Sequence, residues 1–363
     1  MRYFLIAGEP SGDLHAAGLM GAIRDIDPAA EFRFIGGDSM TRIGGKPIIH
    51  IRDLGFMGFT HLLMHFGKIW KTFRVCHREI AAFRPDVVIP VDFGGFNLRL
   101  IRWASARGYR IVYYITPKTW AWAPWRSKKL AKHTRKVLCI LPFEPEFLSG
   151  YGVSALYVGN PVADYTREIC ERHSSQEPVI ALLPGSRKQE IQRILPLMAS
   201  VASGFPGYEV VVAACDPFTD DFYTKLAGNS RIRIERNRTL ELLRISEAAL
   251  VTSGTATLEA AMLGTPQVVC YRTEHISYLI ARILIRVKYI SLVNLILNKP
   301  VVKELIQRDF NKIKLTAELH RILNEPAARS QMQHDYDTLG SVMGQENAYR
   351  QAAEAIWSEV RQS

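Results

Sequence analysis

The sequence predicts an α/β protein made of two doubly wound parallel sheets that face each other across a cleft between domains. Its 363 residues exceed what one hydrophobic core usually organises. Short apolar segments alternate with amphipathic helical segments, a rhythm typical of parallel sheets covered by helices on both faces. This rhythm stops over residues 159–178 and then starts again, which indicates two domains.

The strands predicted for the first domain are brief, rich in β-branched or aromatic residues, and bounded by Gly, Pro or Asp. They cover residues 2–8, 32–37, 87–91, 110–116, 136–142 and 155–159. Because they read as continuous apolar runs rather than alternating ones, we expect them to be buried on both faces.

The second domain repeats the pattern with strands at 179–185, 209–215, 231–235, 248–254 and 267–272. Helices fill the gaps, for example over 255–263 and 316–323. We therefore predict a first domain over 1–165 and a second over 166–335. Residues 336–363 are expected to form helices that pack back on the first domain.

The composition limits the class of protein. Apolar residues make up 48% and charged residues 22%, a balance typical of globular proteins and not of disordered chains. The five cysteines are widely spaced and form no metal-binding pattern, which favours a reduced, cytoplasmic protein. The apolar opening strand is too short for a signal peptide, and no apolar run is long enough to span a membrane, so we expect neither.

The positive charge is concentrated in one part of the chain. The net charge is +11, yet residues 61–136 alone hold 16 Lys and Arg against three acidic residues. Five of the six tryptophans lie in the same stretch. An anionic partner, either a membrane surface or a nucleic acid, would explain this pattern. A solvated basic face over buried tryptophans is the alternative.

Two loops in the second domain have the composition of phosphate-binding turns. "LLPGSRKQEI" (182–191) runs from a strand through Gly185, Ser186 and Arg187 into a helix, where backbone N–H groups and an arginine favour an anion. Ser253, Gly254 and Thr255 follow another strand, with Glu259 one turn into the next helix. A carboxylate there can accept hydrogen bonds from a ribose. Ordinary helix caps are the alternative for both loops.

The first domain also carries polar residues where strands end. Glu9, Ser11, Gly12 and Asp13 follow the opening strand, and Asp92 ends the 87–91 strand shortly before Asn97. An aspartate at the carboxyl end of a parallel strand points toward the expected cleft, where a general base is useful. Capping of the next helix is the equally weighted alternative for Asp92.

These stretches together resemble the lipid-A-disaccharide synthases, bacterial glycosyltransferases of outer-membrane lipid A assembly. The matching strings run in family order from residue 7 to about 307 and include "AGEPSGDLHAAGL", "PDVVIPVDFGGFN", "WAWAPWR", "LPFEPEF", "LLPGSRKQEI", "SGTATLEAAMLGTPQVVCYR" and "VVKELIQ". The resemblance implies a GT-B-type fold, with the nucleotide donor bound mainly by the second domain and the acceptor and membrane served by the first.

The resemblance also implies the reaction. UDP-2,3-diacylglucosamine would donate its sugar to 2,3-diacylglucosamine 1-phosphate, giving the β-1,6-linked disaccharide 1-phosphate and UDP. An α donor and a β product need only one displacement and one base, which matches Asp92. Arg187 would stabilise the leaving UDP without a metal or cofactor, Glu259 would hold the ribose, and Asn294 and Gln307 would complete the donor pocket. The acceptor side of the cleft would be lined by Glu9, Ser11, Gly12, Asp13 and Asn97.

Two positions depart from the family pattern. Phe93 is followed by Gly94 where a proline is common, so the loop beside Asp92 is expected to be looser. Asn160 replaces the histidine of the usual Gly-His-Pro, and an amide cannot carry out that histidine's proton transfers. We expect position 160 to be structural.

Both substrates carry acyl chains, so we expect the protein to dock peripherally on the anionic inner face of the inner membrane. The proposed membrane face holds apolar residues among cations: Phe56, Met57, Phe59, Phe66, Lys68, Trp70, Lys71, Phe73 and Arg74. The alternative is an amphipathic helix with its apolar side in the core. A homodimer is compatible with this interpretation, and the sequence does not decide it.

Two other functions compete with this one. A UDP-N-acetylglucosamine 2-epimerase, or another GT-B sugar transferase, would explain the phosphate loops but gives no use for the basic aromatic stretch. A nucleic-acid binder would use that stretch, but it leaves the loops of the second domain unexplained. No nucleic-acid-binding motif occurs, so no nucleic-acid partner is expected.

Overall fold

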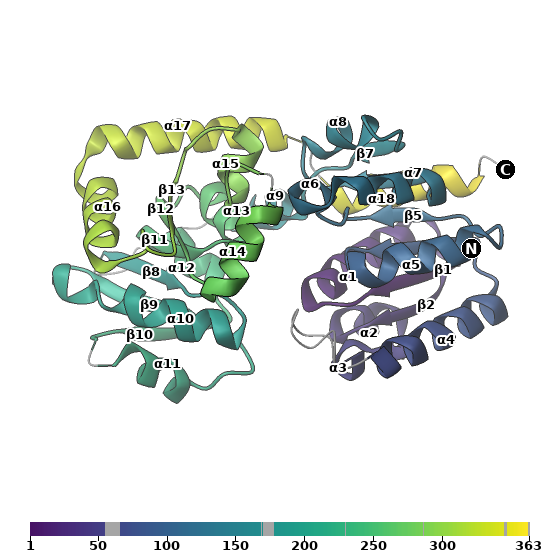
Figure 1. The fold of residues 1–363 in the computed structure, drawn as a ribbon, viewed down its shortest axis with the longest axis horizontal. Coiled ribbons are helices and arrows are strands. Elements are labelled where there is room, and N and C mark those ends of the chain that lie inside the picture. The colour runs from purple at the N-terminus through teal and green to yellow at the C-terminus, as the bar shows by residue number, and fades with distance from the viewer. Residues whose placement is uncertain are drawn as a thin grey trace. The chain divides into compact units, whose positions relative to one another are not determined.

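The computed structural model describes residues 1–54, 66–167, 169, 178–228, 230–285, 287–344 and 347–361. The chain divides into two compact units (Figure 1). Unit 1 comprises Met1–Pro161 and Gln345–Ser363, and unit 2 comprises Val162–Gly344. Each unit is built around its own parallel sheet, which confirms the predicted fold class of two doubly wound domains.

Unit 1 contains a seven-stranded parallel sheet in the order β3-β2-β1-β4-β5-β6-β7. Its strands are β1 (Arg2–Ala7), β2 (Glu31–Gly36), β3 (Ile49–His50), β4 (Val87–Val91), β5 (Val112–Tyr114), β6 (Lys136–Cys139) and β7 (Ala155–Tyr157). The short β3 was not predicted, because two residues carry too little periodicity to be recognised.

Helices cover both faces of this sheet. They are α1 (Pro10–Ile26), α2 (Asp38–Gly44), α3 (Ile51–Leu54), α4 (Phe66–Phe83), α5 (Gly94–Ser105), α6 (Thr119–Trp122), η2 (Pro124–Arg126), α7 (Ser127–His133), α8 (Glu144–Ser149) and α18 (Ala348–Arg361). Successive side chains of a strand point to opposite faces. Tyr3 and Leu5 therefore join the core shared with α1 and α18, whereas Phe4 and Ile6 join the core shared with α4 and α5.

Unit 2 contains a six-stranded parallel sheet in the order β10-β9-β8-β11-β12-β13. Its strands are β8 (Val179–Leu183), β9 (Glu209–Ala214), β10 (Arg233–Arg236), β11 (Ser246–Thr252), β12 (Gln267–Tyr271) and β13 (Lys303–Ile306). β13 was not predicted, because the charged residues Lys303 and Glu304 interrupt its apolar pattern.

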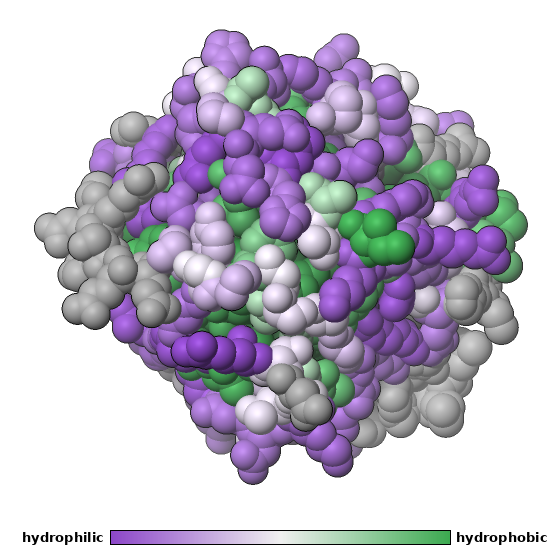
Figure 2. Space-filling view, turned by 90° about the vertical axis from the view of Figure 1, so that its left-hand side faces the viewer, coloured by the Kyte–Doolittle hydropathy of each residue, from purple (hydrophilic) through white to green (hydrophobic). Residues whose placement is uncertain are grey.

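The helices of unit 2 are α9 (Pro161–Arg167), α10 (Lys188–Ala199), η3 (Ala202–Gly204), α11 (Asp220–Ala227), α12 (Thr239–Ile245), α13 (Thr255–Met262), α14 (His275–Leu284), α15 (Leu292–Leu297), α16 (Lys312–Asn324) and α17 (Pro326–Met343). The face of unit 2 in Figure 2 is mostly hydrophilic, with hydrophobic side chains in small separate spots. On this face, the apolar residues are therefore directed mainly toward the interior of the unit.

The C-terminal part of the chain divides at a different residue than the sequence predicted. The expected boundary at 336 falls inside α17, whose buried Met332, Tyr336 and Leu339 belong to the core of unit 2. Only α18 returns to unit 1, where it packs along α1 (Figure 1). The reason is that α17 is one continuous helix and its apolar side faces unit 2 throughout.

Both sheets reverse their strand order at one point. In unit 1 this point lies between the paired strands β1 and β4, and in unit 2 it lies between β8 and β11. In open parallel sheets, ligands bind outside the carboxyl ends of the strands at this switch point. The loops singled out in the sequence follow these four strands.

Candidate functional site

Three loops of unit 1 meet at the carboxyl end of its sheet, and two glycines permit their close approach. A Cβ at Gly8, after β1, would overlap the ring of Phe93, and a Cβ at Gly94 would lie 2.6 Å from the Cβ of Pro117. The loop after β4 is therefore held between the loops after β1 and β5. Gly94 allows this close packing. We had expected a looser loop here, because Gly94 replaces a proline that is common in the family.

Asp92 lies in this packed loop in an unusual backbone conformation. Asp92 and Phe93 have φ angles of 44° and 49°, in the left-handed region that few non-glycine residues adopt. The Asp92 carbonyl accepts hydrogen bonds from the Tyr113 hydroxyl and from Nδ2 of Asn97, the latter at 2.9 Å. These contacts hold the backbone of Asp92 in this conformation, and with it the direction of its Cα–Cβ bond.

The environment of Asp92 changes its acidity. Burial raises the pKa of Asp92 to about 6, and the negative charge of Glu9 acts in the same direction. The ammonium of Lys118 and the N–H of Phe93 act against this and lower the pKa. A carboxyl with a pKa near 6 is mostly ionised at neutral pH and is still basic enough to take a proton from a hydroxyl during a reaction.

A second carboxyl near this site was missed in the sequence, although Glu144 stands inside the quoted string "LPFEPEF". Glu144 is 2% exposed and accepts hydrogen bonds from Nε1 of Trp120 at 2.9 Å and from the N–H of Leu141 at 3.1 Å. Burial raises the pKa of Glu144 to about 7, while Trp120, Leu141 and Lys118 lower it. Glu144 thus anchors the segment that carries Lys118.

The residues after β1 divide into two groups. Glu9 and Ser11 are exposed at the carboxyl end of the sheet, and Gly12 is buried beneath them. Asp13 is also buried, and its carboxylate accepts hydrogen bonds from the N–H groups of Gly37, Ser39 and Met40. In the structure Asp13 therefore holds the start of α2, a role that the spacing of the residues does not reveal.

In unit 2, the turn after β8 has the backbone that the sequence led us to expect. Gly185 has a φ of 103°, which only glycine adopts readily, and it leads through Ser186 to Arg187 at the start of α10. The Arg187 side chain is 70% exposed and forms an ion pair with Glu190 at 3.0 Å. An exposed arginine beside the N-terminus of a twelve-residue helix is suited to bind an anion.

The second loop of unit 2 follows β11 and is held by its own polar side chains. The Ser253 hydroxyl donates to the carbonyl of Ile290 at 2.8 Å, and Gly254 with Thr255 begins α13. Oε1 of Glu259 accepts a hydrogen bond from the Tyr165 hydroxyl at 2.7 Å. Burial raises the pKa of Glu259, and the hydrogen bond from Tyr165 lowers it. Tyr165 on α9 is a partner that the sequence did not indicate.

Asn294 lies at the centre of a buried network. Its Nδ2 donates to the carbonyl of Val302 and to Oε1 of Glu304, both at 2.9 Å, and its Oδ1 accepts from the N–H of Val302. Glu304 also accepts hydrogen bonds from the N–H groups of Ile290 and Ser291. The Asn294 amide therefore fixes the segment that leads to Ser253, and Glu304 is a network member that we missed.

Gln307 plays a similar part after β13. Its Oε1 accepts from the N–H of Thr273 at 3.1 Å, and its Nε2 donates to the carbonyl of the same residue at 3.2 Å. Gln307 is buried and has a φ of 53°. The side-chain amides of Asn294 and Gln307 thus hold the segment between β12 and β13.

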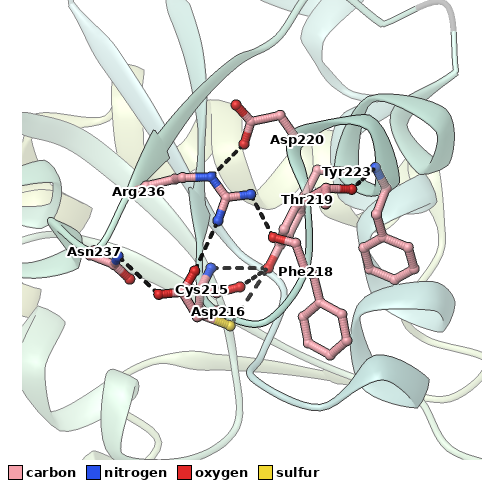
Figure 3. A network of polar contacts seen from close by, with 9 residues as sticks. Cys215, Asp216, Phe218, Thr219, Asp220, Tyr223, Arg236 and Asn237 are labelled. Carbon is pink, nitrogen blue, oxygen red and sulfur yellow. Dashed lines mark hydrogen bonds and ion pairs between the residues drawn. The ribbon is translucent and has the colours of Figure 1, made fainter.

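A further polar network at the same edge of the sheet joins the ends of β9 and β10 (Figure 3). Arg236 contacts Asp220 at 2.6 Å and Asp216 at 3.4 Å, and Asp216 also accepts a hydrogen bond from Asn237. The Tyr223 hydroxyl accepts from the N–H of Cys215 at 3.1 Å. This network ties the loop after β9 to the end of β10.

The expected membrane face on α4 is only partly described. Phe56, Met57 and Phe59 lie outside the described residues, as do the side chains of Phe66 and Lys68. Trp70 is 65% exposed, and Lys71 and Arg74 are exposed near it. The prediction for Phe73 was wrong. Its ring stacks on that of Phe96, with 4.1 Å between the ring centroids, and it packs against the core.

Asn160, the position where the family histidine is replaced, is 2% exposed. Its Nδ2 donates to the carbonyl of Ile140 at 2.8 Å, which ties the end of unit 1 to the loop after β6. This contact agrees with a structural role.

Comparison with known proteins identifies the family. The family model described as lipid-A-disaccharide synthetase matches residues 3–357, nearly the whole chain. The chain belongs to the lipid-A-disaccharide synthetase family. Curated relatives named lipid-A-disaccharide synthase include one from Myxococcus xanthus (strain DK1622), 38% identical over 84% of each chain. Another, from Trichlorobacter lovleyi, is 33% identical over 85% of this chain and 84% of the relative. The protein is therefore a glycosyltransferase of lipid A synthesis, a hexosyltransferase.

Solved structures with this fold include several sugar-nucleotide enzymes. A putative UDP-N-acetylglucosamine 2-epimerase from Listeria monocytogenes aligns with a TM-score of 0.68 at 14% identity, covering 100% of this chain and 97% of that one. The glycosyltransferase of kitacinnamycin aligns with a TM-score of 0.63 at 11% identity, covering 99% and 98%. Identities this low show the fold alone, which is GT-B.

Proposed function

We propose that this glycosyltransferase transfers 2,3-diacylglucosamine from UDP-2,3-diacylglucosamine to O6 of 2,3-diacylglucosamine 1-phosphate. In one displacement, O6 of the acceptor forms a bond to C1 of the donor while the bond from C1 to the diphosphate oxygen breaks. The bonding electrons leave with UDP, and the proton of the 6-hydroxyl passes to Asp92. The product is the β-1,6-linked disaccharide 1-phosphate.

The observation that carries this proposal is the fixed backbone and raised pKa of Asp92. Its backbone is fixed by Tyr113 and Asn97, and its pKa is raised to about 6 by burial. A base with this pKa can accept the hydroxyl proton as the bond to C1 forms. Inversion at C1 needs no second carboxylate as nucleophile, so one base is sufficient.

The roles in unit 2 follow from the chemistry of the donor. We assign the diphosphate to the turn at Gly185, Ser186 and Arg187, where the guanidinium can exchange its contact with Glu190 for the more strongly charged leaving group. We assign the ribose to Glu259, oriented by Tyr165. Ser253, Gly254 and Thr255 would contact the donor through backbone N–H groups. Asn294 and Gln307 would support these loops from below.

The acyl chains of both substrates favour a protein that works at a membrane surface. No helix of the described chain is long and apolar enough to cross a bilayer. We propose peripheral docking through the exposed side of α4, where Trp70 lies beside Lys71 and Arg74.

The test is incubation with both substrates in detergent micelles, followed by mass spectrometry for a disaccharide 1-phosphate and NMR for a β linkage. Asp92→Asn serves as the control that should form little product. UDP release without a disaccharide, or an α linkage, would overturn the proposed reaction.

A further inference from the structure

The exposed apolar residues of unit 2 gather on one segment. Among the described residues of unit 2, six large hydrophobic side chains are exposed, and four of them lie within α14 and the residue after it. These four are Leu279, Ile283, Leu284 and Ile285. Monomeric proteins expose single apolar residues routinely, whereas a cluster of them marks a contact surface.

The two most exposed of these residues lie on one side of α14. Leu279 is 57% exposed and Ile283 is 82% exposed, and residues four apart in a helix are neighbours on the same face. Tyr278, the residue before Leu279, is only partly exposed and points in a different direction around the helix axis. α14 therefore presents an apolar ridge to solvent.

Positive charge accompanies this ridge. Arg282 is exposed between Leu279 and Ile283 in sequence, and Lys288 is exposed shortly after the helix. No aspartate or glutamate occurs from His275 to Lys303 in the sequence. The carboxylate that precedes the helix, Glu274, forms an ion pair with Arg193. The apolar ridge thus lies in a cationic segment.

We propose that α14, with Ile285 and Lys288, is a lipid-docking helix that lies flat in the interface of an anionic bilayer. Leu279 and Ile283 would enter the acyl region, and Arg282 and Lys288 would contact lipid phosphates. A ten-residue helix is about 15 Å long and cannot span the ~30 Å hydrocarbon core, so it must lie along the surface. The inference rests on the proposed function, because acylated substrates reach the enzyme from a bilayer.

A second copy of the chain fits this ridge less well. A two-fold contact places the same patch of each copy against the other, which would bring Arg282 close to its own counterpart. A stable dimer buries about 1,200 Å² or more, and one short helix supplies only a fraction of that. An anionic lipid surface, in contrast, is attracted by the cations and takes up the apolar ridge.

The experiment reads the position of α14 directly. In the full-length protein with Cys170 and Cys215 replaced by serine, Ile283→Cys is labelled with a polarity-sensitive fluorophore. Ile313→Cys is the matched control, because Ile313 is also an isoleucine of unit 2 and is 83% exposed, but stands on α16 without an exposed large apolar neighbour one turn away. The probes are vesicles of phosphatidylglycerol with phosphatidylcholine, and of phosphatidylcholine alone.

We expect emission at position 283 to rise severalfold and shift to the blue with anionic vesicles, and emission at 313 to change little. Leu279→Asp with Ile283→Asp should weaken vesicle flotation about tenfold or more, since the two apolar side chains that would enter the bilayer are lost. Ile313→Asp should float like the wild type. No change at 283 while the protein floats would overturn the proposal, as would unchanged flotation of the double variant or a wild type that does not float.

The result is separable from the proposed reaction. Product formation in detergent micelles does not need a bilayer, so the double variant should retain turnover there. Failure of the vesicle experiment with an intact micellar reaction rejects the docking helix alone. Absence of the disaccharide with the wild type in micelles rejects the proposed reaction, whatever the vesicles show.

Discussion

As the proposed base, Asp92 would have to be ionised, yet burial disfavours its charge. Burial raises the pKa of Asp92 to about 6, although Lys118 acts against it. Its left-handed backbone is a further cost, of about 1–3 kcal/mol. Local destabilisation of this kind is common where a side chain serves a reaction rather than the fold.

Asp92→Asn keeps the shape of the side chain and removes its basicity. Turnover should fall about 10²–10⁴-fold, because proton transfer to a positioned base contributes roughly that much. UDP affinity should change little, since the proposed donor contacts lie in unit 2. The pH–rate profile of the wild type should fall below about pH 6, where Asp92 is protonated. Turnover within threefold of the wild type would mean that Asp92 is not the base.

The same substitution should stabilise unit 1 at neutral pH. The folded-state pKa of Asp92 lies above the value of about 3.8 for an unfolded chain. The contribution of Asp92 to the free energy of unfolding is therefore most favourable below about pH 4, and this contribution is lost as the pH rises through about 6. At pH 8 the asparagine variant should be more stable by about 3 kcal/mol, and near pH 4 the two proteins should converge. Denaturant titrations at both pH values measure this, and an equal difference at both would contradict it.

Arg187→Ala tests the proposed diphosphate site at the turn after β8. Loss of one charge-assisted contact with the diphosphate should weaken UDP binding by about 1.5–3 kcal/mol. Arg193→Ala is the matched control, because Arg193 lies on α10, shortly after Arg187, and pairs with Glu274 instead. Calorimetry with UDP distinguishes the two variants. Equal affinities for UDP in wild type and Arg187→Ala would remove the diphosphate from this turn.

At the scale of elements, α4 has two different sides. Phe73 stacks on Phe96 and belongs to the core, whereas Trp70 is exposed beside Lys71 and Arg74. Of the four described side chains of the expected membrane face, Phe73 thus belongs to the core, which the alternation of apolar and basic residues could not reveal. The exposed side remains suited to an anionic surface.

Replacing Lys68, Lys71 and Arg74 by glutamate should reduce binding to anionic vesicles, because each cation near such a surface contributes about 1 kcal/mol. Turnover on membrane-embedded acceptor should fall with it, while thermal stability stays unchanged. The comparison variant carries the same charge change on α7, at the exposed residues Lys128, Lys129 and Lys132. If only this second variant loses vesicle binding, α7 and not α4 faces the membrane.

At the scale of the whole molecule, the last helix closes the core of the first unit. Ala352, Ala353 and Ile356 of α18 are buried in the core shared with β1 and α1. A contact so distant in sequence makes unit 1 depend on the C-terminal end of the described chain.

Ile356→Ala should destabilise unit 1 by about 2–5 kcal/mol, because it leaves a cavity in this core. Unit 2 should still bind UDP with unchanged affinity. Arg350→Ala, at an exposed position of the same helix, should change stability by less than about 0.5 kcal/mol. Thermal unfolding with and without UDP measures the stability of both units. Loss of UDP binding in Ile356→Ala would contradict the expectation that unit 2 binds UDP whether or not unit 1 is destabilised.

The two parallel sheets, the family and the loops at the switch points follow from the sequence alone, because short buried strands and glycine turns are local features. Hydrogen-bond partners are not local. Glu144 meets Trp120, Tyr165 meets Glu259, and Glu304 meets Asn294 only once the chain has folded. Likewise, Asp13 was expected at the cleft, but three N–H groups of the α2 loop take up its carboxylate. Tertiary structure decided which polar side chains support the site and which remain exposed to a ligand, since burial and partners depend on segments far apart in the sequence.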